Sequence, residues 1–535
     1  MYKLIKKIIF FFETQPLTFS GWVIAFFTLL SLNLFFQFIT YGFKNVNAEY
    51  FIGEIIQSYY FILYLAVVIF LYFLTREKII KILNFVLWGF WSIIFWPVID
   101  KIILRNNFHL SFYLYNGPQE LWHNFITFFG PINPVGILYG TRIETVFIIL
   151  FVGLYIYIKT KSILKTFLGG IGVYLIFYIS VALPSILTFV VTVFSGGNVM
   201  EITNLDIVKF LNTPLQVFAL KERNFAVTFF YKISLVYNLI FVFLLGWFQF
   251  LFNKKVLYVL LKNIRIPQMI FNWGLLIAGL FIGVYYFPQN FSFDFWSVVV
   301  LFNLFLSILF IWLFSIIIND LEDYQIDKIS NKNRPLINKI ISPKNYLNYG
   351  YIFLFLSLLL SLTISGQIFL LIVLYGLVTI IYSKYPFKLK RIPWISGIIS
   401  AIASLFLFLM GYLLLAGNLA DKNFPWLIVL YLFFSYVLIL PIKDLKDIKG
   451  DKKMGVVTIA NLLGENKARL YFGVITFLVY LFSPIIFRDN NLFIPVTITG
   501  GLSYWIINNK KNTSNILLYK LLMVVIIFIV ILIFG

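Results

Sequence analysis

A succession of long apolar runs, separated by short polar loops, occupies most of this 535-residue chain. A helix needs roughly 20 predominantly apolar residues to cross the hydrocarbon core of a bilayer. The runs therefore predict an all-α polytopic membrane protein. Fifteen runs are candidate spans, at about 20–40, 56–75, 79–99, 143–158, 166–193, 228–251, 268–287, 294–318, 347–363, 367–383, 393–416, 424–442, 470–487, 491–508 and 516–534.

The amino-acid composition also favours a membrane protein over a soluble one. Hydrophobic residues make up 61% of the chain and charged residues only 12%, whereas ordinary soluble domains carry about 25% charged residues. In a soluble protein, the net charge of +21 would suggest a nucleic-acid partner. Here the Lys and Arg residues lie in short loops between apolar runs, as they do at the cytoplasmic ends of membrane helices. We therefore expect contact with membrane lipid and no nucleic-acid partner.

The distribution of basic residues predicts the orientation of the spans. With the N-terminus in the cytoplasm, alternation of the spans places most basic loops on the cytoplasmic side. Three predicted outside loops, 194–206, 288–293 and 364–366, contain no Lys or Arg, although two others do. The same alternation places two acidic loops, 319–346 and 443–469, together on the cytoplasmic side.

Several kinds of functional site are excluded because their residues are rare or absent. The chain has no cysteine, so it contains no disulfide, thiolate metal site or cysteine nucleophile. His109 and His123 are its only histidines, which nearly excludes a histidine metal site or a Ser-His-Asp triad.

The chain is expected to divide near residue 255, into an N-terminal transmembrane domain, 1–255, and a C-terminal domain, 256–535. The first domain contains about six predicted spans and no motif that identifies its function. Its scattered carboxylates lie near predicted span ends and are expected to be solvated, although carboxylates at membrane depth are often functional. They are Glu120, Glu144, Glu201 and Asp206.

The first acidic loop contains Asn319, Asp323 and Asp327 at spacings i, i+4 and i+8. On a helix continuing from the preceding span, these residues lie on one face. Two carboxylates there repel each other, but a hard divalent cation would reverse the sign of that interaction. Mg²⁺ prefers one or two carboxylates together with substrate phosphate oxygens, and an amide oxygen can complete its shell. Asp320 and Glu322 lie off this face and are expected to support the site from behind or to be solvated.

The second acidic loop places Asp444, Asp447 and Asp451 at spacings i, i+3 and i+7, again on one helical face. Gly450 can interrupt this helix before Asp451. A single acidic loop is most simply a solvated helix end. Two ordered loops on one side of the membrane, in a chain with only 21 acidic residues, favour a metal site instead.

These residues carry a resemblance to a known family. The run Asn-Asp-x-x-Asp-x-x-x-Asp at 319–327, followed by Asn-Arg-Pro, resembles the first signature of the UbiA superfamily of intramembrane prenyltransferases. The run Lys-Asp-x-x-Asp-x-x-Gly-Asp at 443–451 resembles its second signature. Segments 263–267 and 382–391 resemble the family's Arg-Pro pair and a basic loop, and the nine spans after residue 268 match its nine-helix bundle. The resemblance covers about half of the chain.

The resemblance implies Mg²⁺-dependent transfer of a prenyl group from an isoprenoid diphosphate to an aromatic or lipid acceptor within the membrane. It implies that two triads hold Mg²⁺, with Asp323, Asp327, Asp444 and Asp451 as catalytic residues: Asn319, Asp323 and Asp327 form one triad, and Asp444, Asp447 and Asp451 the other. Tyr382 would stabilise an allylic carbocation through its ring. The groups that would bind the diphosphate are Arg265, Lys328, Arg334, Lys384, Lys443 and Lys452.

Other functions and an unusual residue leave the activity and the acceptor open. A transporter also has many spans, but its carboxylates usually lie near the bilayer midplane in broken helices, whereas these lie at helix ends. A phosphoribosyl- or glycosyltransferase that uses polyprenyl phosphate is a second alternative, and a non-catalytic scaffold is a third. Lys446 stands where lipid-prenylating members of the family often have an acid, which leaves the acceptor open.

Overall fold

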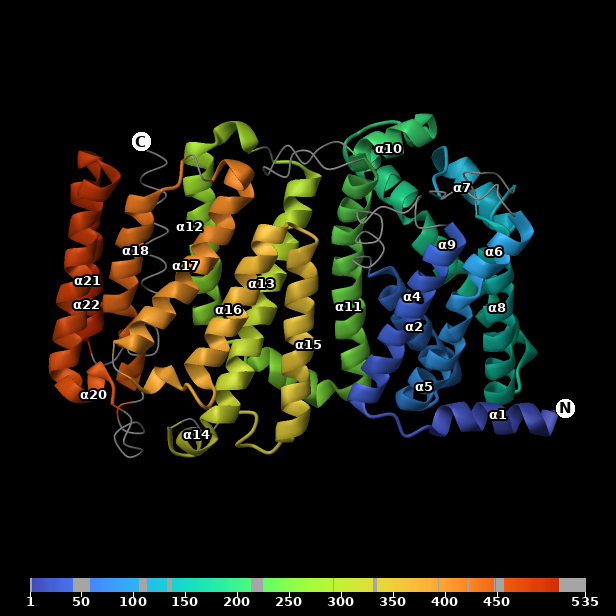
Figure 1. Ribbon diagram of the computed structural model, residues 1–535, viewed down its shortest axis with the longest axis horizontal. Coiled ribbons are helices and arrows are strands. Elements are labelled where there is room, and N and C mark those ends of the chain that lie inside the picture. The colour runs from blue at the N-terminus through green and yellow to red at the C-terminus, as the bar shows by residue number, and fades with distance from the viewer. Residues whose placement is uncertain are drawn as a thin grey trace. The chain divides into compact units, whose positions relative to one another are not determined.

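A computed structural model describes residues 2–41, 58–104, 113–131, 137–212, 225–291, 293–330, 334–392, 394–420, 423–446, 448 and 457–509. Within these ranges the chain is built from helices and contains no strand (Figure 1). The predicted all-α architecture is confirmed. Every predicted span coincides with a helical segment except 516–534, which lies outside the described residues.

The described residues form two compact units, and the chain passes from one to the other between Lys254 and Lys255. Helix α11, Phe225–Lys262, runs through this point and has a non-helical residue, Asn253, just before it (φ −157°, ψ 88°). The first unit contains α1 (Tyr2–Thr14), α2 (Phe19–Tyr41), α4 (Tyr59–Thr75), α5 (Ile79–Gly89), the 3₁₀ helix η1 (Phe90–Ile94), α6 (Trp96–Leu104), α7 (Gly117–Ile126), α8 (Tyr139–Thr160), α9 (Ile163–Phe194), η2 (Val199–Glu201), α10 (Asn204–Asn212) and the first part of α11.

The second unit begins with the end of α11 and continues through ten further α-helices of the described chain. They are α12 (Ile266–Tyr286), α13 (Phe295–Glu322), α14 (Tyr324–Ser330), α15 (Pro343–Leu362), α16 (Gly366–Ser383), α17 (Ile395–Ala416), α18 (Trp426–Ile439), α20 (Ile459–Leu463), α21 (Glu465–Phe487) and α22 (Phe493–Asn508). Two 3₁₀ helices, η4 (Leu389–Arg391) and η6 (Leu440–Lys446), follow α16 and α18 and contribute to the site described below.

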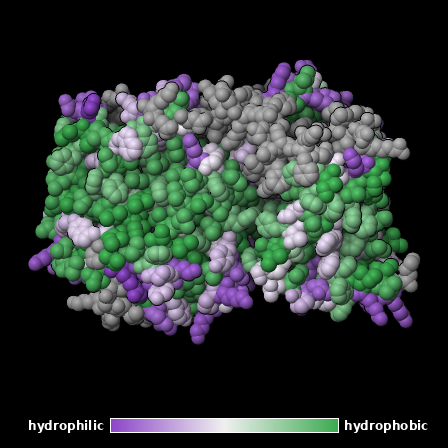
Figure 2. All heavy atoms as spheres, in the orientation of Figure 1, coloured by the Kyte–Doolittle hydropathy of each residue, from purple (hydrophilic) through white to green (hydrophobic). Residues whose placement is uncertain are grey.

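The length and composition of the helices support an integral membrane protein. Twelve of the described helical segments are long and apolar enough to cross a bilayer, and α4, with 17 residues, is slightly shorter. Figure 2 shows apolar side chains over the middle of the helices and hydrophilic side chains gathered toward their ends. The chain is therefore a multi-pass membrane protein.

Helices α12 and α17 of the second unit pack closely against each other. A Cβ at Gly279 would collide with the carbonyl oxygen of Phe408, and a Cβ at Gly411 with that of Leu276. The two backbones can approach this closely because both residues lack a side chain.

The expectation that Glu144 is solvated is wrong. Helix α8 begins at Tyr139, before the predicted start of this span at 143, so residue 144 lies more than a turn inside the helix. Glu144 faces the packed side of α8 and is only 8% exposed. Glu201 and Asp206 are exposed, as expected, and Glu120 is half-buried.

Candidate active site

A cavity of about 310 Å³ lies at one end of the helices of the second unit. Helices α12, α13, α14, α16 and α17 line it together with η4 and η6. In Figure 1, α14 of the first acidic motif and α20, which follows the second, lie at the same end of this unit. The cavity brings together these predicted site residues: Arg265, Asn319, Asp323, Asp327, Arg334, Tyr382, Lys443 and Asp444.

The first acidic motif is not one continuous helix. Helix α13 ends at Glu322, and Asp323 is its C-cap residue (φ −95°, ψ 14°), with its N–H donating to the carbonyl oxygen of Asn319 at 2.9 Å. Helix α14 then begins at Tyr324 and carries Asp327. The predicted straight helix is wrong, but Asn319, Asp323 and Asp327 still line the same cavity.

A lysine that the sequence reasoning did not assign to the site lies between two of these residues. The Lys390 ammonium is 2.6 Å from Asp323 Oδ1 and donates to Asn319 Oδ1 at 2.9 Å. Ser383 Oγ also lies 3.3 Å from Asn319 Oδ1. Burial lowers the pKa of the Lys390 ammonium, and the Asp323 carboxylate acts in the opposite direction. The 3₁₀ turn at 389–391 therefore carries a cation directly onto the first acidic motif.

Asp320 holds two arginine side chains that reach the cavity. Its carboxylate is almost completely buried, and Oδ1 accepts from Arg265 Nη2 at 2.6 Å and from Arg334 Nη1 at 3.2 Å. Its other oxygen, Oδ2, accepts from Asn263 Nδ2 at 3.1 Å and from Tyr346 Oη at 3.0 Å. Both guanidinium groups are thereby oriented by one carboxylate that does not itself line the cavity.

The sequence contains a signal that could have identified the role of Asp320. The residue lies two positions after the apolar run Ile316–Ile318, which ends a predicted span. A carboxylate that follows such a run is costly to bury unless cations and donors surround it. Asp320 lies off the helix face that was predicted to bind metal, so the sequence predicted only a minor role for it.

The second motif begins in the 3₁₀ helix η6, which is only seven residues long. Asp444 lines the cavity, and the neighbouring Lys443 Nζ donates to Tyr382 Oη at 2.8 Å and to Ser400 Oγ at 3.0 Å. The same ammonium lies 4.9 Å from the centre of the Tyr382 ring. The remaining predicted residues of this motif, Asp447, Asp451 and Lys452, lie outside the described residues.

Two predicted diphosphate ligands do not line the cavity. Lys328 follows Asp327 on α14, where its ammonium lies over the Tyr324 ring at 4.5 Å and bonds to Gln325 Oε1 at 3.3 Å. Lys384 is the exposed C-cap residue of α16, with an extended backbone that turns away from the helix (φ −95°, ψ 146°). Lys328 follows Asp327 of the first acidic motif and Lys384 lies two residues after Tyr382. Neither lysine lines the cavity, although Asp327 and Tyr382 do.

The donors in the cavity fit Mg²⁺ by type. Asn319, Asp323, Asp327 and Asp444 supply carboxylate and amide oxygens, which are the ligands that Mg²⁺ prefers. Within the described ranges, no three acidic or histidine side chains are close enough to form a metal-binding cluster. Assignment of these residues as metal ligands stays a prediction.

Comparison with known proteins identifies relatives of the second unit. Residues 269–529 match the model of the UbiA prenyltransferase family. The digeranylgeranylglyceryl phosphate synthase of Methanosphaera stadtmanae is 31% identical over 176 residues, which are 32% of this chain and 61% of that protein. The enzyme of the same name from Pyrococcus horikoshii is 28% identical over 187 residues, 35% of this chain and 62% of that protein. The chain thus spans about three fifths of the length of these curated relatives.

A solved structure was also found. A UbiA homolog from Archaeoglobus fulgidus bound to DMAPP and Mg²⁺ has a TM-score of 0.39 and 20% identity, and the alignment covers 50% of this chain and 99% of that one. The family match begins at residue 269 and does not include the first unit. The C-terminal half of the chain, through residues 269–529, therefore belongs to the UbiA prenyltransferase family.

Proposed function

We propose that this protein transfers a prenyl group from an isoprenoid diphosphate to a lipid acceptor, with Mg²⁺ as cofactor, in the cavity at the end of α13. The observation that carries the proposal is the meeting of the two acidic motifs, through Asp323 and Asp444, in one cavity that also contains cations. Membership of the UbiA prenyltransferase family supports the same reaction.

The polar end of the cavity suits a diphosphate. Arg265, Arg334 and Lys443 line it, and Asp320 orients both guanidinium groups. In the described part of the chain, Arg265 Nε is a buried donor without a hydrogen-bond acceptor, so an anionic ligand would satisfy it. Bound Mg²⁺, held by Asn319, Asp323, Asp327 and Asp444, would add positive charge against the departing diphosphate. The predicted ligands Asp447 and Asp451 belong to the same proposal.

The apolar end of the cavity suits a prenyl chain. Its lining includes Phe271, Trp312, Ile316, Val378 and Leu407. Burial of apolar surface against such residues stabilises a bound hydrocarbon by roughly 25 cal/mol per Å². The ring of Tyr382 also lines the cavity and would stabilise positive charge on the allylic carbon.

The identity of the relatives favours a lipid acceptor over an aromatic one. They are named digeranylgeranylglyceryl phosphate synthases, and such a product contains a prenylated glyceryl phosphate. We therefore take the acceptor to be the hydroxyl group of a lipid of this type. The acidic motifs are proposed to lie on the cytoplasmic side, in accord with the distribution of basic loops.

The test uses membranes that contain the full-length protein, labelled geranylgeranyl diphosphate and a geranylgeranylglyceryl phosphate acceptor. Asp323→Ala and Asp444→Ala should each lower the Mg²⁺-dependent release of pyrophosphate and the formation of labelled lipid by at least about 100-fold, a loss of ~2.7 kcal/mol of transition-state stabilisation. Glu322→Gln is the matched control, because Glu322 pairs with Lys388 and does not line the cavity.

Three outcomes would contradict the proposal. Retained turnover in both Asp variants would reject the assignment of the acidic motifs. Uptake of the diphosphate without release of pyrophosphate would favour a transporter. Transfer of a sugar or ribose phosphate onto polyprenyl phosphate, in place of prenyl transfer, would favour the second alternative.

A further inference from the structure

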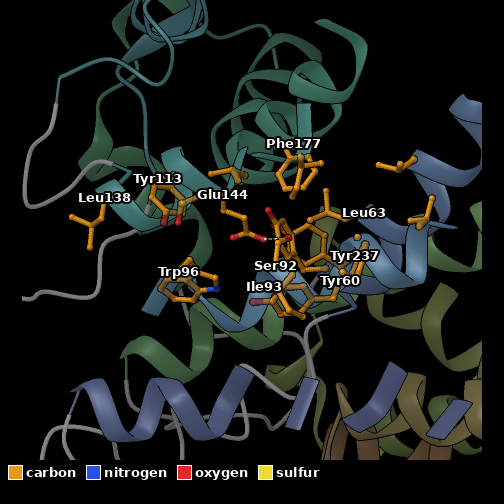
Figure 3. A pocket seen from close by; sticks show the side chains of 18 of the residues that line it. Tyr60, Leu63, Ser92, Ile93, Trp96, Tyr113, Leu138, Glu144, Phe177 and Tyr237 are labelled. Carbon is orange, nitrogen blue, oxygen red and sulfur yellow. Dashed lines mark hydrogen bonds between the residues drawn. The ribbon is translucent and has the colours of Figure 1, made fainter. Parts of the chain in front are cut away.

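The first unit contains a second cavity, of about 220 Å³, lined by residues of α4, α5, η1, α6, α8, α9 and α11 (Figure 3). Most of its lining is apolar, and much of it is aromatic. The UbiA family match does not include this unit. The cavity is therefore separate from the proposed prenyl-transfer site and needs its own explanation.

Two buried carboxylates line this cavity. Asp100, near the end of α6, has no exposed surface, and Glu144, on α8, is 8% exposed. Among the described residues that line the cavity, none is Lys, Arg or His. The two acids thus have no basic partner in the lining, and an ionised carboxylate buried without one is strongly unfavourable. A ligand that carries positive charge would compensate them.

The backbone at the start of α8 is adapted to hold Asp100. Gly140 donates its N–H to Asp100 Oδ1 at 2.7 Å, where the dipole of α8 also favours negative charge. A Cβ at residue 140 would lie 2.9 Å from Asp100 Oδ2 and would collide with the carbonyl oxygen of Trp96. Only a residue without a side chain leaves room for the carboxylate here.

Helix capping alone does not explain Asp100. Capping uses Oδ1, while Oδ2 is buried and has no hydrogen-bond partner in the described part of the chain. A buried acceptor left without a partner costs about 1–3 kcal/mol, and more when it is charged. This second oxygen, in a residue that lines the cavity, is available to a ligand.

Glu144 lies one turn beyond Gly140 on α8, and Gly140 is the residue whose N–H binds Asp100 of α6. Ser92 Oγ donates to Glu144 Oε1 at 3.3 Å. In Figure 3 the Glu144 side chain extends into the space between Tyr113, Trp96 and Phe177, with the bond to Ser92 drawn as a dashed line. The carboxylate is therefore presented to the cavity from within an aromatic enclosure.

The aromatic lining suits the same kind of ligand. Faces of Trp and Tyr rings attract organic cations by roughly 0.5–2 kcal/mol each, most strongly when the cation is desolvated. A bare metal ion would need several oxygen ligands to replace its water, whereas most of this lining is apolar. Carboxylates within an aromatic enclosure instead match an ammonium group with an apolar substituent.

We propose that the first unit binds an amphiphilic organic ammonium ion, with its charged group at Asp100 and Glu144 and its apolar part against the aromatic lining. This site is independent of the prenyl-transfer reaction. Benzylammonium, whose N–H groups can donate to Asp100 Oδ2, is a suitable probe, and benzyl alcohol and benzoate are its neutral and anionic counterparts.

The experiment measures binding of the three labelled probes to the purified full-length protein by equilibrium dialysis. The wild type should bind benzylammonium and neither counterpart. Glu144→Gln and Asp100→Asn, which preserve shape and remove charge, should each weaken binding at least ten-fold. Glu201→Gln is the control, because Glu201 is an exposed carboxylate outside the cavity and should leave binding unchanged.

Several results would overturn the proposal. Equal binding of benzyl alcohol would identify a merely apolar cavity. Unchanged benzylammonium binding in both charge-removing variants would show that the carboxylates are not part of the site. Stabilisation of the wild type by NaCl alone, without ammonium binding, would assign the two acids to an inorganic cation. If the variants fail to fold, as judged by their thermal unfolding, the binding of the three probes to the wild type still tests whether the cavity prefers a cation.

Discussion

At the scale of single residues, the second unit places charges in positions that the motifs do not reveal. Asp320 is flanked by Asn319 and close to Asp323, yet it contacts arginines rather than the cavity. Lys390 contacts Asp323 and Asn319, although these residues lie 67 and 71 positions earlier in the chain. The contacts of Asp320 and of Lys390 each lead to a specific prediction.

Asp320→Asn should destabilise the protein and weaken diphosphate binding. The substitution removes the charge that Arg265 and Arg334 share, and leaves Arg334 only a 3.9 Å contact with Asp327. Loss of one partner of a buried ion pair costs on the order of 3 kcal/mol. We expect a lower unfolding temperature and a raised KM for the prenyl diphosphate, with a smaller effect on kcat. Thermal unfolding and steady-state kinetics measure these effects. Glu322→Gln, which breaks a partly exposed pair with Lys388, should change both by little. A wild-type KM in Asp320→Asn would refute this positioning role.

Lys390→Gln should strengthen metal binding while it weakens diphosphate binding. The ammonium and a divalent cation compete for the oxygens of Asn319 and Asp323, so its removal should tighten binding of Mn²⁺, as a stand-in for Mg²⁺, by about ten-fold, or ~1.4 kcal/mol. Electron paramagnetic resonance of free Mn²⁺ measures this affinity. Lys388→Gln is the control, because Lys388 pairs with Glu322. Unchanged Mn²⁺ affinity in Lys390→Gln would argue against metal binding at these two residues.

At the scale of helices, close packing positions the elements that line the active-site cavity. Helices α12 and α17 approach so closely that Gly279 and Gly411 contact backbone atoms of the opposite helix. In a bilayer, such small-residue contacts replace the hydrophobic driving force that water provides elsewhere. The end of α13 at Glu322 and the short 3₁₀ helix η6 after α18 have a different role, because they place the first acidic motif and Asp444 of the second at the cavity.

Gly411→Ala should separate α12 from α17. The added methyl group meets the backbone of Leu276, which cannot move as a side chain can, so we expect a loss of about 1–3 kcal/mol in stability. Thermal unfolding of the solubilised protein checks this loss. Gly501→Ala on α22 is the matched control, since no atom lies within 4 Å of its added Cβ, and higher helix propensity should leave it unchanged or slightly stabilised. Equal unfolding temperatures for the two variants would contradict the packing argument.

At the scale of the whole molecule, the natural absence of cysteine allows the predicted topology to be tested directly. Lys344→Cys, in the exposed first turn of α15, should react with a membrane-impermeant maleimide only from the cytoplasmic side. Gln289→Cys, exposed between α12 and α13, should react only from the opposite side. The unmodified protein is the blank. Labelling of Lys344→Cys from outside in intact cells would reverse the proposed orientation of the acidic motifs.

The positions of the spans followed from the sequence because each span is specified locally. An apolar run of sufficient length must form its backbone hydrogen bonds within itself once it enters a bilayer. The run 294–318, for example, became α13, and 395–416 lies within the predicted span 393–416. The two acidic motifs were equally local, because their spacing and their place after a span are visible in the sequence.

The sequence by itself thus determined the all-helical membrane class, the approximate positions of the described spans and the family of the C-terminal half. Only the tertiary structure decided that Asp320 orients Arg265 and Arg334, that Lys390 contacts the first motif, and that Glu144 is buried beside a cavity. The physical reason is that these outcomes depend on which residues from distant helices come within a few ångströms of each other. Such contacts are set by helix packing and by the bends at helix ends, and neither periodicity nor motif spacing encodes them.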